Sequence, residues 1–227
     1  PNFELKFWPK KGKIQRHSFS VMPISIWRPE LDFENSDYTI ISTWEANFQN
    51  SSQLRFQMFN RYIKLYDEFD PTRTDDAIPL PADQNYYYTS FEVSFRSDQR
   101  KKVSYRINPS VGQFFNGNKY SLESSLSLRL QPYFSGSIQM NYDKIDLPDP
   151  YPDASIWLIG PKIDITFTKN MFWSTFFQYS TQRENFSINT RFQWRVAPLS
   201  DLFLVYNDNY STTVFSPRFR SLNLKFT

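Results

Sequence analysis

Apolar and polar residues alternate along much of this chain. From Asn185 to Val196 the sequence reads N-F-S-I-N-T-R-F-Q-W-R-V. Successive side chains of a β-strand point to opposite faces of its sheet, so the segment predicts a strand with one apolar face and one polar, hydrated face. The apolar register holds Phe186, Ile188, Phe192, Trp194 and Val196. The polar register holds Asn185, Ser187, Asn189, Arg191, Gln193 and Arg195.

The same alternation recurs in eight other parts of the chain. The polar positions between the apolar ones are too highly charged for the dry interior of a β-sandwich, so we expect about 13 strands whose second face meets water. The apolar registers are Phe3-Leu5-Phe7, Tyr38-Ile40-Trp44-Phe48, Tyr87-Phe91-Val93-Phe95, Val103-Tyr105-Ile107, Leu122-Leu126-Leu128-Leu130, Phe134-Ile138-Met140-Tyr142, Ile163-Ile165-Phe167 and Leu222-Leu224-Phe226. The polar registers include Glu4, Lys6, Glu45, Glu92, Arg96, Lys102, Arg106, Glu123, Arg129, Gln139, Asn141, Lys162, Asp164 and Lys225.

These patterns predict an all-β fold, a transmembrane antiparallel up-and-down β-barrel, with residues 1–227 as a single domain that forms the C-terminal part of the barrel. No segment approaches the roughly 18 consecutive apolar residues of a membrane helix. The polar mean hydropathy of −0.58 fits a barrel, because its lipid face and its lumen face cancel in the average. The aromatic content of 19% suits aromatic girdles at both membrane interfaces. A soluble all-β sandwich is the alternative.

Predicted connections between strands alternate between short and long, with an exception at Gln182–Glu184. Outer-membrane barrels have short periplasmic turns and longer outer loops, so the rhythm predicts an outer-membrane protein whose C-terminus is periplasmic. The expected long loops are Arg28–Ser36, Asp67–Asn85, Pro109–Lys119, Lys144–Ser155 and Asn209–Pro217. The first strand would then start outside, so we expect preceding strands and about 14 or 16 strands in the intact barrel.

Candidate chemistry is sparse, and we expect neither an enzyme nor a cofactor or metal protein. The chain has no Cys, one His and 5 Gly, which leaves no zinc site, no Gly-x-Ser-x-Gly elbow and no phosphate loop. We expect His17 to be structural. The net charge of +3 is spread over the chain, so nucleic acid is not an expected partner. The expected partners are outer-membrane lipid and, in the anchoring alternative below, other outer-membrane or periplasmic proteins.

Three segments allow two interpretations each. In Gln53–Tyr66 the apolar register changes parity, as a one-residue bulge or a strand leaving the membrane would produce. The acidic residues of Asp143–Asp153 are either calcium ligands or part of a solvated, proline-stiffened loop. A set of aromatic residues near the expected long loops could stack on sugar rings or belong to an interfacial belt. That set is Tyr86, Tyr87, Tyr88, Phe114 and Phe115.

Charged residues of the polar registers are the candidate functional residues. They could form cross-strand ion pairs that fill and stiffen a lumen, or a ring of charge that selects solutes. The candidates for lumen-facing positions are Arg191, Arg195, Arg129, Arg106, Glu123 and Glu92.

The segment Asn189–Asp208, N-T-R-F-Q-W-R-V-A-P-L-S-D-L-F-L-V-Y-N-D, resembles a near-terminal signature of bacterial carbohydrate-binding family 9 domain-containing proteins, whose C-terminal domain has no known function. The signature is approximately N-x-R-x-x-W-x-x-x-P-G-S-D-L-F-x-V-Y-N, and Leu199 replaces its glycine. The resemblance implies that an outer-membrane barrel follows an N-terminal sugar-binding-like β-sandwich. It implies no catalytic residue.

Two functions remain open from the sequence. One is a transport or channel barrel, for saccharides or peptides, with the charged residues along its path. The other is a plugged structural or anchoring barrel that is itself a subunit of a larger outer-membrane complex. The ligand is unknown in either case.

Overall fold

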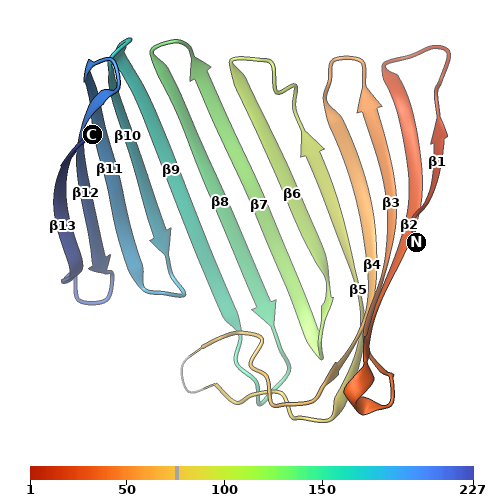
Figure 1. Ribbon diagram of the computed structural model, residues 1–227. Coiled ribbons are helices and arrows are strands. Elements are labelled where there is room, and N and C mark those ends of the chain that lie inside the picture. The colour runs from red at the N-terminus through yellow and green to blue at the C-terminus, as the bar shows by residue number, and fades with distance from the viewer. Residues whose placement is uncertain (75–76) are drawn as a thin grey trace. The chain divides into compact units, whose positions relative to one another are not determined.

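A computed structural model describes residues 1–74 and 77–227 as one antiparallel meander of strands (Figure 1). Each strand pairs with its neighbours in sequence, and the sheet order runs from β1 to β13 without a crossover. The strands are β1 (Phe3–Phe7), β2 (Ile14–Arg28), β3 (Glu34–Phe48), β4 (Gln53–Leu65), β5 (Gln84–Arg96), β6 (Val103–Phe114), β7 (Gly117–Leu130), β8 (Phe134–Asp146), β9 (Ala154–Thr168), β10 (Met171–Ser180), β11 (Asn185–Ala197), β12 (Ser200–Ser211) and β13 (Pro217–Phe226). The predicted all-β, up-and-down fold of about 13 strands is confirmed.

The sheet is not closed into a barrel, since β1 and β13 are its two edges. Apart from the short 3-10 turn η1 (Pro29–Leu31), the described residues contain no helical element. Accordingly, the described part of the chain has no helix long and apolar enough to cross a membrane.

Two compact units make up the described chain. Unit 1 holds β1–β5 and parts of β6–β9, and unit 2 holds the remainder of β6–β9 and all of β10–β13. Unit 1 comprises Pro1–Gln99, Arg106–Leu122 and Asp143–Ser155, and unit 2 comprises Arg100–Tyr105, Glu123–Tyr142 and Ile156–Thr227.

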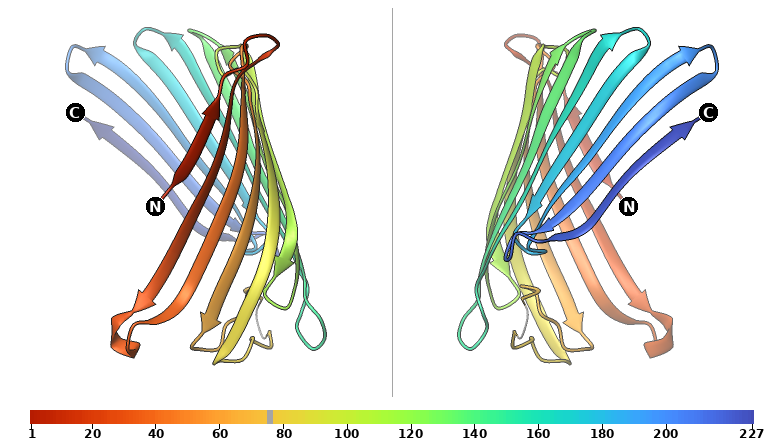
Figure 2. Two further views of the ribbon diagram at one scale, coloured as in Figure 1. Left: turned by 90° about the vertical axis from the view of Figure 1, so that its right-hand side faces the viewer. Right: turned by 90° about the vertical axis from the view of Figure 1, so that its left-hand side faces the viewer.

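The edge strand β1 is much shorter than its neighbour. Its 5 residues pair with the segment of β2 from His17 to Val21, whereas β2 is 15 residues long (Figure 2). On the β1 side, the rest of β2 therefore has no strand partner within the described residues. An edge of this kind is a ready template for pairing with a further strand.

The predicted bulge in β4 is wrong. This strand pairs with β5 over its whole length and with β3 from Gln53 to Ile63, in both cases without a register shift. The change of parity instead leaves Phe59 and Ile63 on the same face as Arg61. Their environment explains this placement, because Ile63 lies opposite Tyr86 of β5 and the Arg61 guanidinium lies 4.5 Å from the Phe59 ring centroid.

The long loop predicted at Pro109–Lys119 is also wrong. Strand β6 continues through Pro109 to Phe114, and only residues 115 and 116 separate it from β7. Proline and glycine look like loop signals in the sequence, but Gly112 has a packing role here. A Cβ atom on Gly112 would lie 2.3 Å from the Ser90 Cα on β5, so only glycine permits this approach of the two strands.

The connections at the two ends of the strands consequently differ less in length than the sequence predicts. One end, the long-loop end, carries the connections 66–83 and 147–153 as well as the tight 115–116 turn. The other, the turn end, carries short connections such as 49–52 and 169–170. The longest connections do share one end, but the strict alternation is lost.

A conventional hydrophobic core is nearly absent from the described residues. Their buried apolar side chains are Ala46, Leu80, Tyr88 and Ile145. The large apolar side chains of the strands are mostly exposed, so burial inside this chain does not account for the alternating pattern.

Candidate functional site: the two faces of the sheet

Strand register assigns each side chain to one of two faces, because residues directly opposite each other point to the same side. In unit 1, Glu45 lies opposite Arg55, and Trp44 lies opposite Phe56. In unit 2, Arg191 lies opposite Ser174 and Val205. We call the face of Glu45 in unit 1 and of Arg191 in unit 2 the polar face, and the reverse side the apolar face.

The apolar face is an exposed oily surface in both units. Phe19 is 53% exposed in unit 1, and Leu222 is 67% exposed in unit 2. Soluble monomers rarely expose contiguous apolar patches of more than a few hundred Å². Other exposed members include Leu5, Val21, Ile40, Phe56, Phe91, Val93, Ile107, Leu126, Ile138, Ile163, Leu204, Leu224 and Phe226.

Aromatic rings gather on the apolar face toward the long-loop end. Tyr62 stacks between Tyr38 and Tyr87, at centroid distances of 5.4 and 4.7 Å, in unit 1. Tyr142 and Trp157 lie 4.4 Å apart in unit 2. Rings with a polar edge suit the boundary between an apolar and an aqueous phase.

A second set of rings lies toward the turn end. His17 stacks between Phe7 and Trp44, and it accepts a hydrogen bond from Trp44 Nε1 through Nδ1. His17 is thus packed as part of the strand surface. On β3, Trp44 is six residues from Tyr38, about 20 Å along the strand. The positions between them on this face of β3, β4 and β5 hold apolar residues (Ile40, Met58 and Phe91) together with Ser42 and the hydrogen-bonded pair Asn60 and Thr89.

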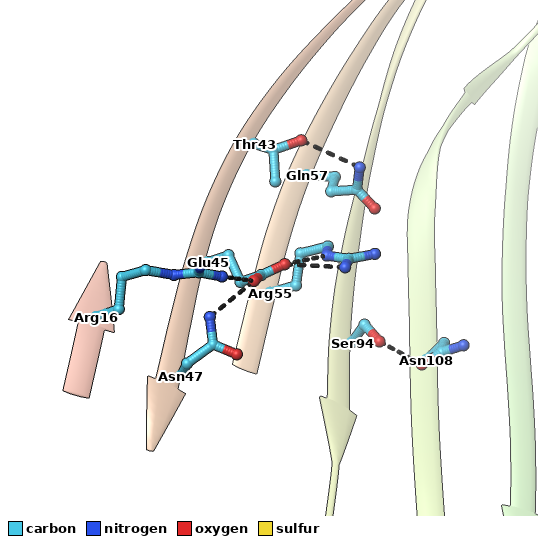
Figure 3. A network of polar contacts seen from close by, with 8 residues as sticks. All are labelled: Arg16, Thr43, Glu45, Asn47, Arg55, Gln57, Ser94 and Asn108. Carbon is cyan, nitrogen blue, oxygen red and sulfur yellow. Dashed lines mark hydrogen bonds and ion pairs between the residues drawn. The ribbon is translucent and has the colours of Figure 1, made fainter. Parts of the chain in front are cut away.

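On the polar face of unit 1, Glu45 is the centre of an ionic network (Figure 3). Its carboxylate accepts hydrogen bonds from Arg55 at 2.9 and 3.1 Å, from Asn47 at 2.8 Å and from Arg16 at 3.4 Å. The donors come from β2, β3 and β4, so one carboxylate ties three strands together. Only 14% of the Glu45 side chain is exposed, which strengthens these contacts relative to surface ion pairs.

Neutral hydrogen bonds extend this face across the neighbouring strands. Gln57 donates to Thr43 at 3.1 Å, and Ser94 bonds to Asn108 at 2.7 Å (Figure 3). The polar face therefore satisfies its groups mainly by cross-strand pairs. Cross-strand ion pairs and hydrogen bonds are thus present on this face, and its role as the lining of a lumen stays a prediction.

Two of the six candidate residues lie in unit 1. Glu92 is opposite Gln57 on β4 and Ser110 on β6, so it is on the polar face. Arg106 lies directly opposite Arg96 and is exposed. Two like charges at a cross-strand position repel, so this pair favours an anionic neighbour or solvent between them.

The other four candidates lie in unit 2. Arg129 donates to Ser104 Oγ at 3.2 Å, and Glu123 is exposed on the same strand, β7. Arg191 and Arg195 line a cavity of about 380 Å³ together with Lys162 and Asp164. The structure thus brings Arg191 and Arg195 together in one site.

Carboxylates balance part of the charge in this cavity. Asp164 accepts bonds from Ser174 at 2.6 Å and Ser135 at 3.4 Å and pairs with Lys162 at 3.1 Å. Arg195 pairs with Asp201 of β12 at 3.4 Å. These contacts hold two of the three cations of the cavity.

The aromatic set at the long-loop end divides between the faces. Tyr87 belongs to the ring stack of the apolar face. Phe115 instead packs against Tyr86, Tyr88 and Phe69, at centroid distances of 5.3, 5.7 and 5.5 Å. Phe69 belongs to the 66–83 connection, and its backbone bridges to Leu80, which is fully buried.

The acidic loop around β8 and β9 uses its carboxylates for internal contacts. Asp143 pairs with Lys119 at 3.2 Å, and Asp146 pairs with Lys144 at 3.0 Å. Asp153 accepts a hydrogen bond from the Leu147 amide. Within the described chain, no group of three acidic or histidine residues has the geometry of a metal site.

Several polar-face residues escaped the sequence-based list of candidates. Arg16 and Arg55 of the Glu45 network and Asp201 beside Arg195 were not selected. Their parity along each strand was visible in the sequence. The residues that they would meet on the next strand were not, because those depend on register.

These observations define a class of protein: an antiparallel, up-and-down β-sheet with one exposed apolar face and one polar, hydrogen-bonded face. No protein family, curated protein or solved structure matches this chain. The resemblance to carbohydrate-binding family 9 domain-containing proteins stays a prediction.

Proposed function

We propose that this chain forms part of an outer-membrane β-barrel whose polar face lines a path for small polar solutes. The observation that carries the proposal is the contrast between the two faces. Leu222 and Phe19 are exposed on a face that no element of the described chain covers, while Glu45 is held in ionic contacts on the other face. Lipid against the first face and water against the second would satisfy both.

The positions of the aromatic rings support the same proposal. Rings at the long-loop end and at the turn end flank a mostly apolar band, which includes Ile40, Met58 and Phe91, as in the girdles of outer-membrane barrels. In hydrocarbon an unpaired sheet edge is costly, so both β1 and β13 would pair with a strand in the membrane.

Planar-bilayer recording of the full-length protein tests conduction. We expect stable single-channel currents that change when Arg191→Ala or Arg195→Ala alters the polar face of unit 2. Lys11→Ala, in a connection at the turn end, removes one charge outside the strands and should leave the current amplitude unchanged. Silence from a verified folded barrel would contradict conduction.

An obstructed anchoring barrel is the second candidate. It is favoured by the apolar cluster at the long-loop end of unit 1, where Phe69 of the 66–83 connection packs on Phe115 and Leu80 is fully buried. Side chains packed over a polar face narrow any path along it. Persistent silence in the bilayer experiment would support this candidate and direct attention to partner proteins.

A further inference from the structure

The cavity on the polar face of unit 2 has an imbalance of charge that the proposed function does not explain. It is lined by three cations, Lys162, Arg191 and Arg195, and by one carboxylate, Asp164. Lys162 is held by Asp164 and Arg195 by Asp201. The remaining cation is Arg191.

No carboxylate neutralises Arg191 within the described residues. Its direct cross-strand neighbours are Ser174 on β10 and Val205 on β12. Its guanidinium carbon lies 5.9 Å from the centroid of Phe203, which leaves the donors at the edge of the guanidinium plane available to a ligand.

The groups around Arg191 suit an anion rather than a cation. Gln193 also lines the cavity, and its amide can donate hydrogen bonds. The carboxylate of Asp164 is already engaged by Ser174, Ser135 and Lys162. A planar guanidinium matches the oxygen spacing of a carboxylate or a phosphate and binds either through two parallel hydrogen bonds.

We propose that this cavity is a binding subsite for solutes that carry a carboxylate or a phosphate group, with Arg191 as the main ligand. The proposal rests on the polar face being a solute path, and it adds the chemical class of the solute. A cavity of about 380 Å³ accommodates one such small anion with its hydration.

Reversal potentials in asymmetric KCl test the selectivity. We expect the unmodified protein to prefer anions and Arg191→Gln to lower the anion-to-cation permeability ratio by up to about tenfold, because a charge about 6 Å from the path changes each ion's local concentration about threefold in water. The change should shrink at high salt. The control is Arg218→Gln, which removes an equal charge from a side chain that donates to the Arg183 carbonyl and the Ser211 hydroxyl.

Blocking experiments distinguish a specific anion-binding site from a general electrostatic attraction of anions to the polar face. Inorganic phosphate and acetate should each reduce the chloride current of the unmodified protein. Arg191→Lys keeps the charge but loses the bidentate hydrogen-bond donor. It should therefore retain the anion preference of the current, while block by either probe weakens about tenfold or more. Equal block in Arg191→Lys and the unmodified protein would overturn the role of the guanidinium.

Phosphate binding to the refolded protein in detergent, followed by ³¹P NMR line broadening, does not depend on conduction. Broadening that disappears in Arg191→Gln but persists in Arg218→Gln supports the subsite, even if the bilayer is silent and conduction is refuted. Currents that are cation-selective and insensitive to Arg191, without broadening, overturn the subsite and leave conduction standing.

Discussion

Leu126→Arg is expected to destabilise the membrane-inserted protein by about 2–4 kcal/mol, the cost of arginine on the lipid face near the middle of a bilayer. Leu126 lies in the second half of β7, four residues before its end, on the apolar face, and it is 48% exposed. In a soluble protein, a polar substitution at so exposed a site would be almost neutral. The substitution therefore separates a lipid-facing surface from a water-facing one.

Ser125→Arg is the matched control for Leu126→Arg. It introduces the same side chain one residue away, on the polar face, where we expect a change of less than about 0.5 kcal/mol. Urea titration of protein in lipid vesicles, followed by tryptophan fluorescence, measures both effects. Equal effects of the two substitutions would refute the assignment of faces to lipid and water.

Glu45→Gln is the second substitution with a large expected effect, about 1.5–3 kcal/mol of unfolding free energy. The amide keeps the shape of the side chain but removes the charge that Arg16 and Arg55 share (Figure 3). Two guanidinium groups would then face each other without a carboxylate between them. The loss should be smaller in high salt, since screening weakens the repulsion.

Thr43→Val is the control for the ionic part of that effect. It removes a neutral hydrogen bond with Gln57 on the same face and should cost about 0.5–1.5 kcal/mol, with little dependence on salt. The same urea titration applies. If Glu45→Gln were no more costly than Thr43→Val, the network would be a surface feature without a stabilising role.

Glu45→Gln and Thr43→Val bear on function because both residues lie on the polar face. In the proposed barrel the polar face must stay hydrated without collapsing, and the Glu45 carboxylate, which is bonded to β2, β3 and β4, stiffens it. Arg191, in contrast, lacks such a partner within the described residues. Under the proposal, the Glu45 carboxylate holds the sheet together, whereas the Arg191 guanidinium is available to a solute.

The sequence alone determined the strand count and the division of residues between two faces. Alternation with a period of two residues is a local property of strands, so Phe186 and Arg191 could be assigned to opposite faces without a structure. The polar registers also located every one of the six candidate residues on strands, from Glu92 of β5 to Arg195 of β11.

Only the tertiary structure decided which charges meet. Arg55 pairs with Glu45, and Arg195 with Asp201, because turns and bulges set the register between strands, and no local pattern encodes it. The continuation of β6 through Pro109 also depends on tertiary structure. In the sequence Gly112 is a loop signal, whereas in the sheet it is required because the Ser90 backbone of β5 lies so close. Leu80 is likewise buried in the 66–83 connection, where its backbone bridges to Phe69, and composition and periodicity do not specify such a contact.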